Sequence, residues 1–425
     1  MPGPRELTAR SRLKNTLRVV TTTGLLLLAG PGFAAGSSTS TLTLDQALQS
    51  AFADNPELAA AQWEIGIAEG DRQQAGLIPN PEVSWEAEDT RRDSRTTTVM
   101  LSQPIELGGK RGARIDVASR AQDAAGIELE RRRNTLRADV IQAFSAVQTA
   151  QHRLQLSRQS LQIAEQGVRV AQGRIEAGKS SPIEGTRAQV QLSEVRLELS
   201  RAERDKATAY QQLVQVMGTP IPASVDVQAA RQNTLIVPPS RLLERLNDTA
   251  ELRLAKLQID QREASLGLEK AQRIPDLTVS VGSQYDETER EWVNVVGLSM
   301  PIPLFNRNQG NVLAAARRAD QARDLRNATE LRLRTETQTA LEQWQTANDE
   351  VKAFNQSILP AAQSAVDSAT RGFEMGKFTF LEVLDAQRTL ISARTQYIQA
   401  VAEATDARVR IERIFGDLGV FAVSP

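Results

Sequence analysis

Four short segments of the chain alternate apolar and polar residues, which is the pattern of a strand with one face in an apolar environment. In the first of them Val83, Trp85 and Ala87 point to one side, and the polar residues between them point to the other. A charged turn follows, and the same arrangement returns in the second half of the chain. The predicted strands cover 82–90, 96–105, 277–282 and 292–300.

Segments of this length with apolar-out, polar-in alternation are typical of membrane β-barrel strands. An amphipathic hairpin lying on a soluble core is the alternative. The rest of the chain weakens that alternative, because it offers only thin helices and no globular core for four half-apolar strands to cover. Four strands cannot close a barrel alone, since the smallest bacterial membrane barrels have about eight, and open strand edges are not tolerated in lipid. Several chains must then pool their strands, and three chains would supply twelve.

Outside the hairpins the apolar residues follow a helical period. Between 113 and 177 there is no proline, and apolar residues recur every seven positions, with a small residue three positions after each of the first four. The recurring residues are Val147, Leu154, Leu161, Val168 and Ile175. This pattern predicts a coiled-coil seam on a helix that would be about 100 Å long. A shorter helix is predicted over 44–77, and Pro360 predicts a kink or break near Leu359 in the second long helix.

The chain repeats one plan twice: a helix, two strands, a very long helix and a return helix. Pro81 and Pro275 are 194 positions apart, and the Gly-Lys pairs at 178–179 and 376–377 are 198 apart. We therefore predict one unit over 36–425. Its parts are repeat one (42–218), a linker (219–239), repeat two (240–416) and a C-terminal tail (417–425).

The N-terminal residues have the pattern of a secretory signal. Five basic side chains precede an apolar stretch at 19–29, and small residues follow that could be cleaved. The alternative is a membrane anchor, but a stretch of about 11 residues is short of the roughly 20 that a spanning helix needs. A signal peptide over 1–35 and export of the remainder are the expectation.

Composition excludes several classes of function. The 425 residues include 51 Lys and Arg against 52 Asp and Glu, so the excess positive charge of a nucleic-acid-binding protein is missing. There is no cysteine and a single histidine, His152, which argues against disulfides, Cys-ligated zinc and a His-based metal site or catalytic triad. We expect no enzyme activity and no cofactor.

Several motifs, in order along the chain, resemble one known family. They are the opening segment at 42–48, the Asn-Pro-Glu-Leu step at 55–58, the duplicated hairpins, and the helical turn at 372–377 with the helix start at 380–387. Together they resemble the TolC-like outer membrane factors of tripartite efflux pumps and type I secretion systems. The segment at 103–111, Gln-Pro-Ile-Glu-Leu-Gly-Gly-Lys-Arg, is most similar to the heavy-metal (cobalt–zinc–cadmium) efflux branch.

The resemblance implies a mainly α fold with a pair of membrane β-hairpins. Three chains would form a 12-stranded β-barrel in the outer membrane of a Gram-negative bacterium, continued by a periplasmic α-helical barrel. A periplasmic adaptor (membrane fusion) protein would dock at the tip, and a proton-driven RND transporter of the inner membrane would supply the energy. The chain itself would be a passive conduit for divalent heavy-metal cations. Drug efflux or type I protein secretion is the alternative, and a periplasmic coiled-coil scaffold without a pore is a more remote one.

Two turns between long helices are candidate docking sites. Their glycines suit the left-handed position that ends a helix, and Ser181-x-x-Glu184 and Thr379-x-x-Glu382 have the spacing of capping boxes. The resemblance implies that adaptor hairpins recognise these turns. The docking candidates are Gly178, Lys179, Gly376, Lys377 and Phe378.

Four further residues are candidates for the channel itself. Glu382 and Asp385 lie one helical turn apart and match the periplasmic constriction of the family, where rings of three carboxylates would favour cations. The alternative is that Glu382 caps its helix and Asp385 faces solvent. Trp85 and Trp292 occur once in each hairpin, as girdle residues at the lipid headgroups or as ordinary strand aromatics.

Overall fold

The computed structural model describes residues 41–89, 91–221, 225–228 and 239–418. All of them belong to the second of two units, Ser40–Pro425. The predicted signal peptide, much of the linker and nearly all of the C-terminal tail lie outside the described residues.

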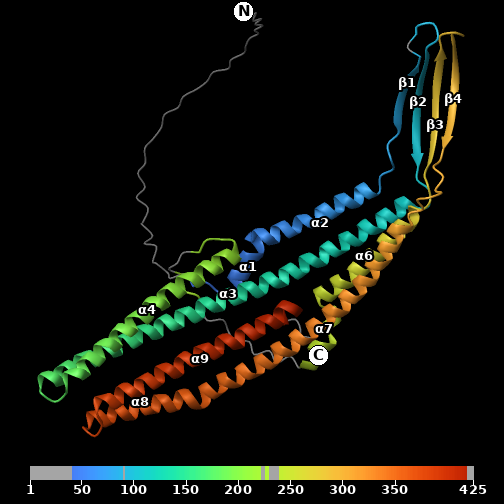
Figure 1. Ribbon diagram of the computed structural model, residues 1–425. Coiled ribbons are helices and arrows are strands. Elements are labelled where there is room, and N and C mark those ends of the chain that lie inside the picture. The colour runs from blue at the N-terminus through green and yellow to red at the C-terminus, as the bar shows by residue number, and fades with distance from the viewer. Residues whose placement is uncertain (1–40, 90, 222–224, 229–238, 419–425) are drawn as a thin grey trace, which may run out of the picture. The chain divides into compact units, whose positions relative to one another are not determined.

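Four strands form one antiparallel sheet with the order β1-β2-β3-β4 (Figure 1). The strands are β1 (Glu82–Glu88), β2 (Thr96–Ile105), β3 (Leu277–Asp286) and β4 (Glu291–Ser299). The central pair joins the two predicted repeats, with Leu101 opposite Val281 and Ser102 opposite Ser280. β1 and β4 are therefore the edge strands of the sheet. The period-2 alternation located all four strands, although β3 runs to Asp286 rather than ending near 282.

Long helices make up the rest of the unit. The first half contributes α2 (Pro56–Ala75), α3 (Lys110–Glu176) and α4 (Pro182–Met217), and the second contributes α6 (Ala250–Ala271), α7 (Gln309–Ala353), α8 (Leu359–Glu374) and α9 (Phe380–Phe415). α3 packs against α2, α4, α6 and α9, and α7 packs against α6 and α9. The sheet lies at one end of α3, and the turn between α3 and α4 lies at the other (Figure 1). Among the described helices, none combines the length and the apolar content needed to cross a membrane.

The helix predicted over 44–77 is wrong as a single element. The structure has α1 (Leu44–Asp54) and then α2, with Asn55 between them in an extended conformation. A proline disfavours the helical conformation at the residue before it, and Pro56 fits the first turn of the new helix. The Asn55 side chain accepts a hydrogen bond from the Leu58 amide at 2.9 Å and donates one to the Val216 carbonyl at 2.8 Å. The joint is thus capped and tied to the end of α4.

The predicted interruption near Leu359 is confirmed. A five-residue π-helical segment, η2 (Phe354–Ile358), separates α7 from α8, and Pro360 lies in the first turn of α8. A proline has no N–H for the helical ladder and its ring clashes with the preceding turn. The wider π turn absorbs one extra residue, and α3 has no such interruption over its 67 residues.

The core is thin and lies where α1 meets α3 and α4. Phe144 is 1% exposed, and Val140, Val147 and Leu213 are fully buried. Small clusters connect α7 and α9 to α5 (Pro239–Glu244) and to the 3-10 turn η1 (Leu246–Asp248). Of the predicted seam on α3, the first two apolar positions are buried, and the next three are half-buried. The coiled coil is therefore tightest near this core and opens toward the helical turns.

Candidate functional site

The two helical turns end in the same backbone geometry. Gly178 and Gly376 have φ angles of 70° and 71°, which is the left-handed region expected for them. The N–H of Lys179 donates to the Arg174 carbonyl at 2.8 Å, and the N–H of Lys377 donates to the Gly372 carbonyl, also at 2.8 Å. These bonds define a Schellman motif. All five predicted docking residues are exposed, so the turns present them to solvent.

The two turns differ in chemistry. In the α3–α4 turn, Arg174 Nε donates to the Ser180 hydroxyl at 3.1 Å. At the equivalent positions of the α8–α9 turn, the Phe378 ring lies directly over Gly372, where any added Cβ would overlap the ring. The second turn also exposes a group of large apolar side chains. These are Phe373 (40%), Met375 (63%), Phe378 (45%) and Leu381 (71%).

The second capping box is confirmed and the first is wrong. At the start of α9, Glu382 accepts a hydrogen bond from the Thr379 amide at 2.6 Å, and its own amide donates to the Thr379 hydroxyl at 3.4 Å. This amide hydrogen bond lowers the pKa of Glu382. At the start of α4 the Ser181 hydroxyl accepts from the nearer amide of Ile183 instead. Glu382 is therefore a cap, and Asp385 one turn later is exposed.

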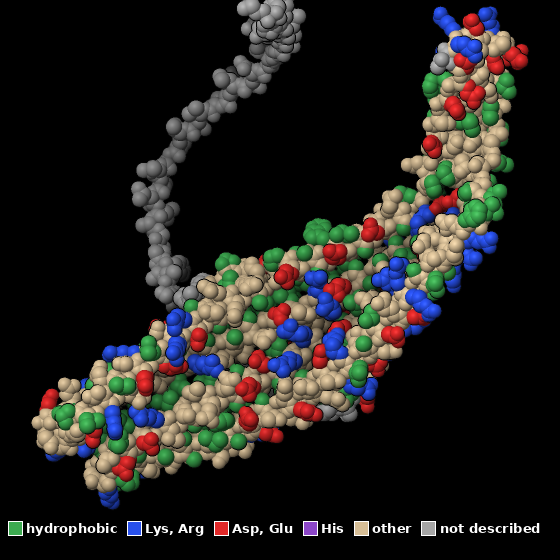
Figure 2. Space-filling model, viewed as in Figure 1, with side chains coloured by type: hydrophobic (Ala, Val, Ile, Leu, Met, Phe, Trp, Pro, Cys, Tyr) green, Lys and Arg blue, Asp and Glu red, His purple; other side chains and the backbone are tan. Residues whose placement is uncertain are grey.

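The sheet keeps an exposed apolar face (Figure 2). Trp85 and Trp292 are 68% and 67% exposed, and the Trp292 ring lies 5.0 Å from that of Tyr285 between centroids. Other large apolar strand residues are equally open: Val83 (71%), Val296 (74%) and Leu298 (72%). A hairpin resting on its own helices would bury these side chains. The alternative of an amphipathic hairpin on a soluble core is therefore not what the chain forms.

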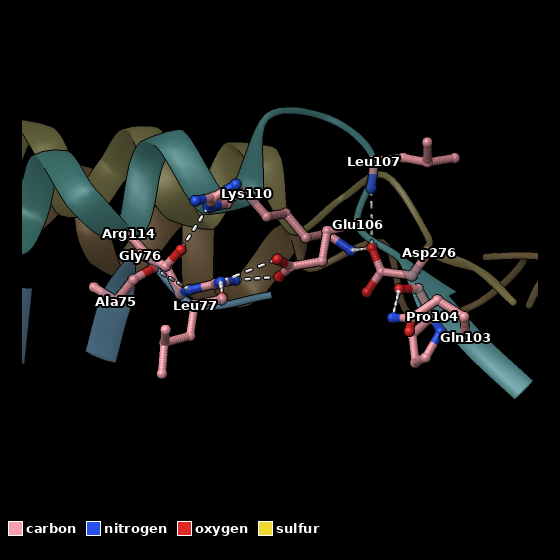
Figure 3. A network of polar contacts seen from close by, with 11 residues as sticks. Ala75, Gly76, Leu77, Gln103, Pro104, Glu106, Leu107, Lys110, Arg114 and Asp276 are labelled. Carbon is pink, nitrogen blue, oxygen red and sulfur yellow. Dashed lines mark hydrogen bonds and ion pairs between the residues drawn. The ribbon is translucent and has the colours of Figure 1, made fainter. Parts of the chain in front are cut away.

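A network of polar contacts joins the sheet to the helices (Figure 3). Lys110 Nζ lies 2.6 Å from Asp276 Oδ1, which also accepts a hydrogen bond from the Leu107 amide at 3.2 Å. Arg114 donates to both carboxylate oxygens of Glu106 and to the Leu77 carbonyl at 3.1 Å. The side chains of Lys110 and Glu106 are each only 12% exposed.

This junction binds three chain segments together. Arg114 and Arg111 donate to carbonyls at the C-terminal end of α2, where the helix dipole favours cations. Hydrogen bonding from Arg114 lowers the pKa of Glu106, which keeps the carboxylate ionised. Lys110 is therefore held inside the network, whereas Arg111 makes its hydrogen bond from an exposed position. Sequence reasoning also missed Arg114, Glu106 and Asp276, because their partners are set by the packing of the two halves of the chain.

The described residues contain no group of three or more His, Cys, Asp or Glu side chains close enough to hold a metal ion. His152 is exposed on α3. The described structure therefore combines an open apolar sheet, a charged junction and two exposed helical turns.

Comparisons with known proteins agree with this arrangement. The family model described as outer membrane efflux protein matches residues 47–219 and 242–417. The cobalt-zinc-cadmium resistance protein CzcC of Cupriavidus metallidurans is 38% identical, with 88% of this chain and 90% of that protein covered. The nickel and cobalt resistance protein CnrC of the same organism is 28% identical, covering 71% and 73%. Among solved structures, the Campylobacter jejuni CmeC outer membrane channel gives a TM-score of 0.75 at 15% identity and covers 88% of this chain and 85% of that one.

Proposed function

The chain belongs to the outer membrane efflux protein family, and from that premise we propose that it is the outer-membrane conduit of a tripartite pump exporting divalent heavy-metal cations such as cobalt, zinc and cadmium. Members of the family are channels and not enzymes, and the protein lies in the outer membrane and extends into the periplasm. The observation that carries the cargo is the full-length similarity to a protein named for cobalt, zinc and cadmium resistance.

The shape of the sheet supports a trimer. β1 and β4 leave one edge each unpaired in the single chain, and their apolar side chains are exposed. In lipid, every backbone N–H and C=O needs a partner, so the edges must be closed by further strands. Three copies would give a 12-stranded barrel, which is within the size range of bacterial outer-membrane barrels. The long helices would continue as a tunnel through the periplasm.

The two helical turns support a docking role for a periplasmic adaptor. They lie at the end of the helices away from the sheet (Figure 1), and all five candidate residues are exposed. A proton-driven RND transporter of the inner membrane would supply the energy through that adaptor. The chain would then be a passive conduit that the adaptor opens at the tip. Glu382 and Asp385 would place two rings of carboxylates near this opening and favour cations.

Growth assays test the cargo. Deletion of the gene should lower tolerance to zinc, cobalt and cadmium, and the wild-type gene should restore it. A deletion that leaves metal tolerance unchanged but increases sensitivity to drugs would overturn the metal assignment in favour of drug efflux. Loss of secretion of one protein substrate would favour type I secretion in the same way. A detergent-extracted trimer in the membrane fraction is expected, whereas a soluble rod would support the scaffold alternative.

Single-channel recording tests the carboxylate rings. Asp385→Asn should reduce cation preference in planar bilayers because it removes three charges from the trimer without altering the cap of α9. The matched control is Thr379→Ala, which weakens that cap and keeps both carboxylates. Unchanged selectivity in Asp385→Asn, or an equal change in the control, would return these residues to a structural role.

A further inference from the structure

We propose that Arg307 forms an ion pair with Glu82 of the partner subunit, and that Phe305 packs beside it against Leu77 of the partner subunit, clasping adjacent copies at the base of the barrel. The inference rests on the proposed trimer and deepens it. It names the surface of this chain that receives a second copy. Three lines of observation carry it: an internal junction, its equivalent positions, and the strand register.

The internal junction shows how one half of the chain meets the other. The turn between β2 and α3 packs on the turn between α6 and β3, with the Lys110–Asp276 ion pair at 2.6 Å (Figure 3). Gly108 approaches so closely that an added Cβ would lie 2.8 Å from Ile274. Within one chain this contact joins β2, the second strand of the first hairpin, to β3, the first strand of the second hairpin. A closed ring must repeat the same kind of contact between chains.

Buried positions fix which residues are equivalent. Residues separated by 197 positions are buried alike on α3 and α7, and residues separated by 194 are buried alike on α2 and α6. The buried pairs are Leu136 and Leu333, Ala143 and Ala340, Phe144 and Leu341, Ala150 and Ala347, Leu58 and Leu252, and Ala61 and Ala255. At these separations Lys110 corresponds to Arg307, and Asp276 corresponds to Glu82. Both halves of the chain therefore have a cation at the first of these positions and a carboxylate at the second.

The equivalent residues are open in the single chain. Phe305 is 90% exposed and Leu77 is 58% exposed. Arg307 and Glu82 are also exposed, and among the described residues neither the guanidinium nor the carboxylate makes an ion pair. Phe305 lies two residues before the cation Arg307, and Leu77 lies five residues before the carboxylate Glu82, so the two surfaces are complementary in polarity and in charge.

The bulky side chain comes from different segments in the internal junction and in the proposed junction between chains. Inside the chain a glycine, Gly108, faces the bulky Ile274. Gly108 also approaches the Ala271 carbonyl, at 3.0 Å from an added Cβ, so at the equivalent outer positions Phe305 would face Asn80 and Leu77 of the partner subunit. A phenyl ring can therefore fill the space that the isoleucine fills in the internal junction. Such an exchange of volume keeps a contact packed.

The strand register agrees with this pairing. β2 pairs with β3 up to Ile105, opposite Leu277, whereas β4 ends at Ser299, three residues before the equivalent Ile302. In the internal register Leu101 faces Val281, which places Leu298 opposite Ala87 of the partner subunit. Both are on the apolar side of their strands, so the transferred register keeps one apolar face around the ring. A slip by one residue would turn that face inward.

Cross-linking tests the proposed contact between Arg307 and Glu82 of the partner subunit. Because the chain has no cysteine, only the introduced cysteines can react. The variant Arg307→Cys with Glu82→Cys is treated in the membrane with a short bifunctional maleimide. The expected result is a ladder of covalent dimer and trimer on denaturing gels. Lys110→Cys with Asp276→Cys calibrates the reagent, since the equivalent pair must cross-link within one chain, as a mass increase of the monomer. Arg307→Cys with Glu86→Cys is the mismatched control, because Glu86 lies about 13 Å further along the strand, and it should give no ladder.

A charge exchange provides a second test. Arg307→Glu should make the trimer dissociate at a lower temperature, and adding Glu82→Arg should restore the wild-type temperature. An intact trimer by light scattering that gives no Arg307–Glu82 cross-link, while the internal pair reacts, would overturn the clasp and leave the proposed conduit standing. Failure of the wild-type protein to form a trimer in membranes would overturn the proposed assembly itself.

Discussion

Arg114 offers a direct test of how the sheet is attached to the helices. Its guanidinium donates to both oxygens of Glu106 and to the carbonyls of Leu77 and Ala75, at 3.1 and 3.4 Å. Arg114→Met keeps the length and the apolar part of the side chain and removes every one of these donors. Glu106 would then be a carboxylate that is 12% exposed and has lost the guanidinium that hydrogen-bonds to both of its oxygens.

The expected cost follows from these contacts. Hydrogen bonds between charged groups contribute about 1.5–3 kcal/mol to stability. A partly buried carboxylate that is left without its partner adds its desolvation penalty to the free-energy cost of the substitution. Arg114 is itself 30% exposed, so water screens part of the loss. We expect about 2.8 kcal/mol, which corresponds to about 100-fold in the equilibrium constant for local opening of the junction.

Hydrogen exchange measured by mass spectrometry on the detergent-solubilised protein reports this opening. The Leu107 amide is a built-in reporter because it donates to Asp276. Peptides covering 104–114 should exchange about 100-fold faster in Arg114→Met. The matched control is Arg111→Met, which removes one hydrogen bond, at 2.6 Å to the Gly76 carbonyl, and should change exchange by about fivefold or less.

The stabilisation of the junction by the Arg114–Glu106 pair should depend on pH. Arg114 holds the pKa of Glu106 below its ordinary value, so the pair stabilises the junction at pH values above the pKa of the unfolded chain. The stabilisation is lost as the pH falls through the lowered pKa of the folded protein. The gap between wild type and Arg114→Met should therefore shrink in acid. A gap that is below fivefold at neutral pH, or that widens in acid, would refute the account.

Three further outcomes are expected. Thr379→Ala removes the cap of α9 and should cost about 1 kcal/mol, seen as faster amide exchange in the first turn of α9; an equal effect of Ser181→Ala, which lacks the reciprocal carboxylate bond, would contradict this. Burial raises the pKa of Asp406, so Asp406→Asn should stabilise the protein against urea above that raised pKa and lose its advantage as the pH falls through it; a gain that persists in acid would speak against burial as the cause. Phe144→Ala should cost about 3–5 kcal/mol of unfolding free energy because Phe144 is 1% exposed, and a urea midpoint close to wild type would show that the core collapses around the cavity.

The elements that the sequence predicts well are those set by local pattern. The strands follow from alternation with period 2, and the long helices follow from a seam that recurs every seven residues. Pro360 marks the π-helical interruption at Phe354–Ile358 for a purely covalent reason, the missing N–H. The break at Asn55-Pro56 had an equally local signal, a capping residue followed by a first-turn proline. It was missed because the apolar period on either side of it continues in phase.

The elements that the sequence does not predict depend on tertiary placement. Lys110 and Asp276 are 166 residues apart, and only the pairing of β2 with β3 brings them together. Charged residues beside a strand end are usually solvated, so nothing in their own segments singles them out. The Ser181 cap differs from the Thr379 cap by a small change in backbone direction that composition does not encode.

The two halves share a backbone plan but differ in chemistry wherever they meet other surfaces. One helical turn is closed by Arg174 and Ser180, and the other by Phe378 over Gly372. In a ring of three copies these turns alternate, so a partner at the tip meets a polar turn and an apolar turn in succession. In the proposed ring the junction at the other end would differ in the same way, with Gly108 at the contact within one chain and Phe305 at the contact between chains. Duplication would therefore supply the proposed ring with two kinds of contact between hairpins, one made within a chain and one made between chains, and the side chains differ between the two.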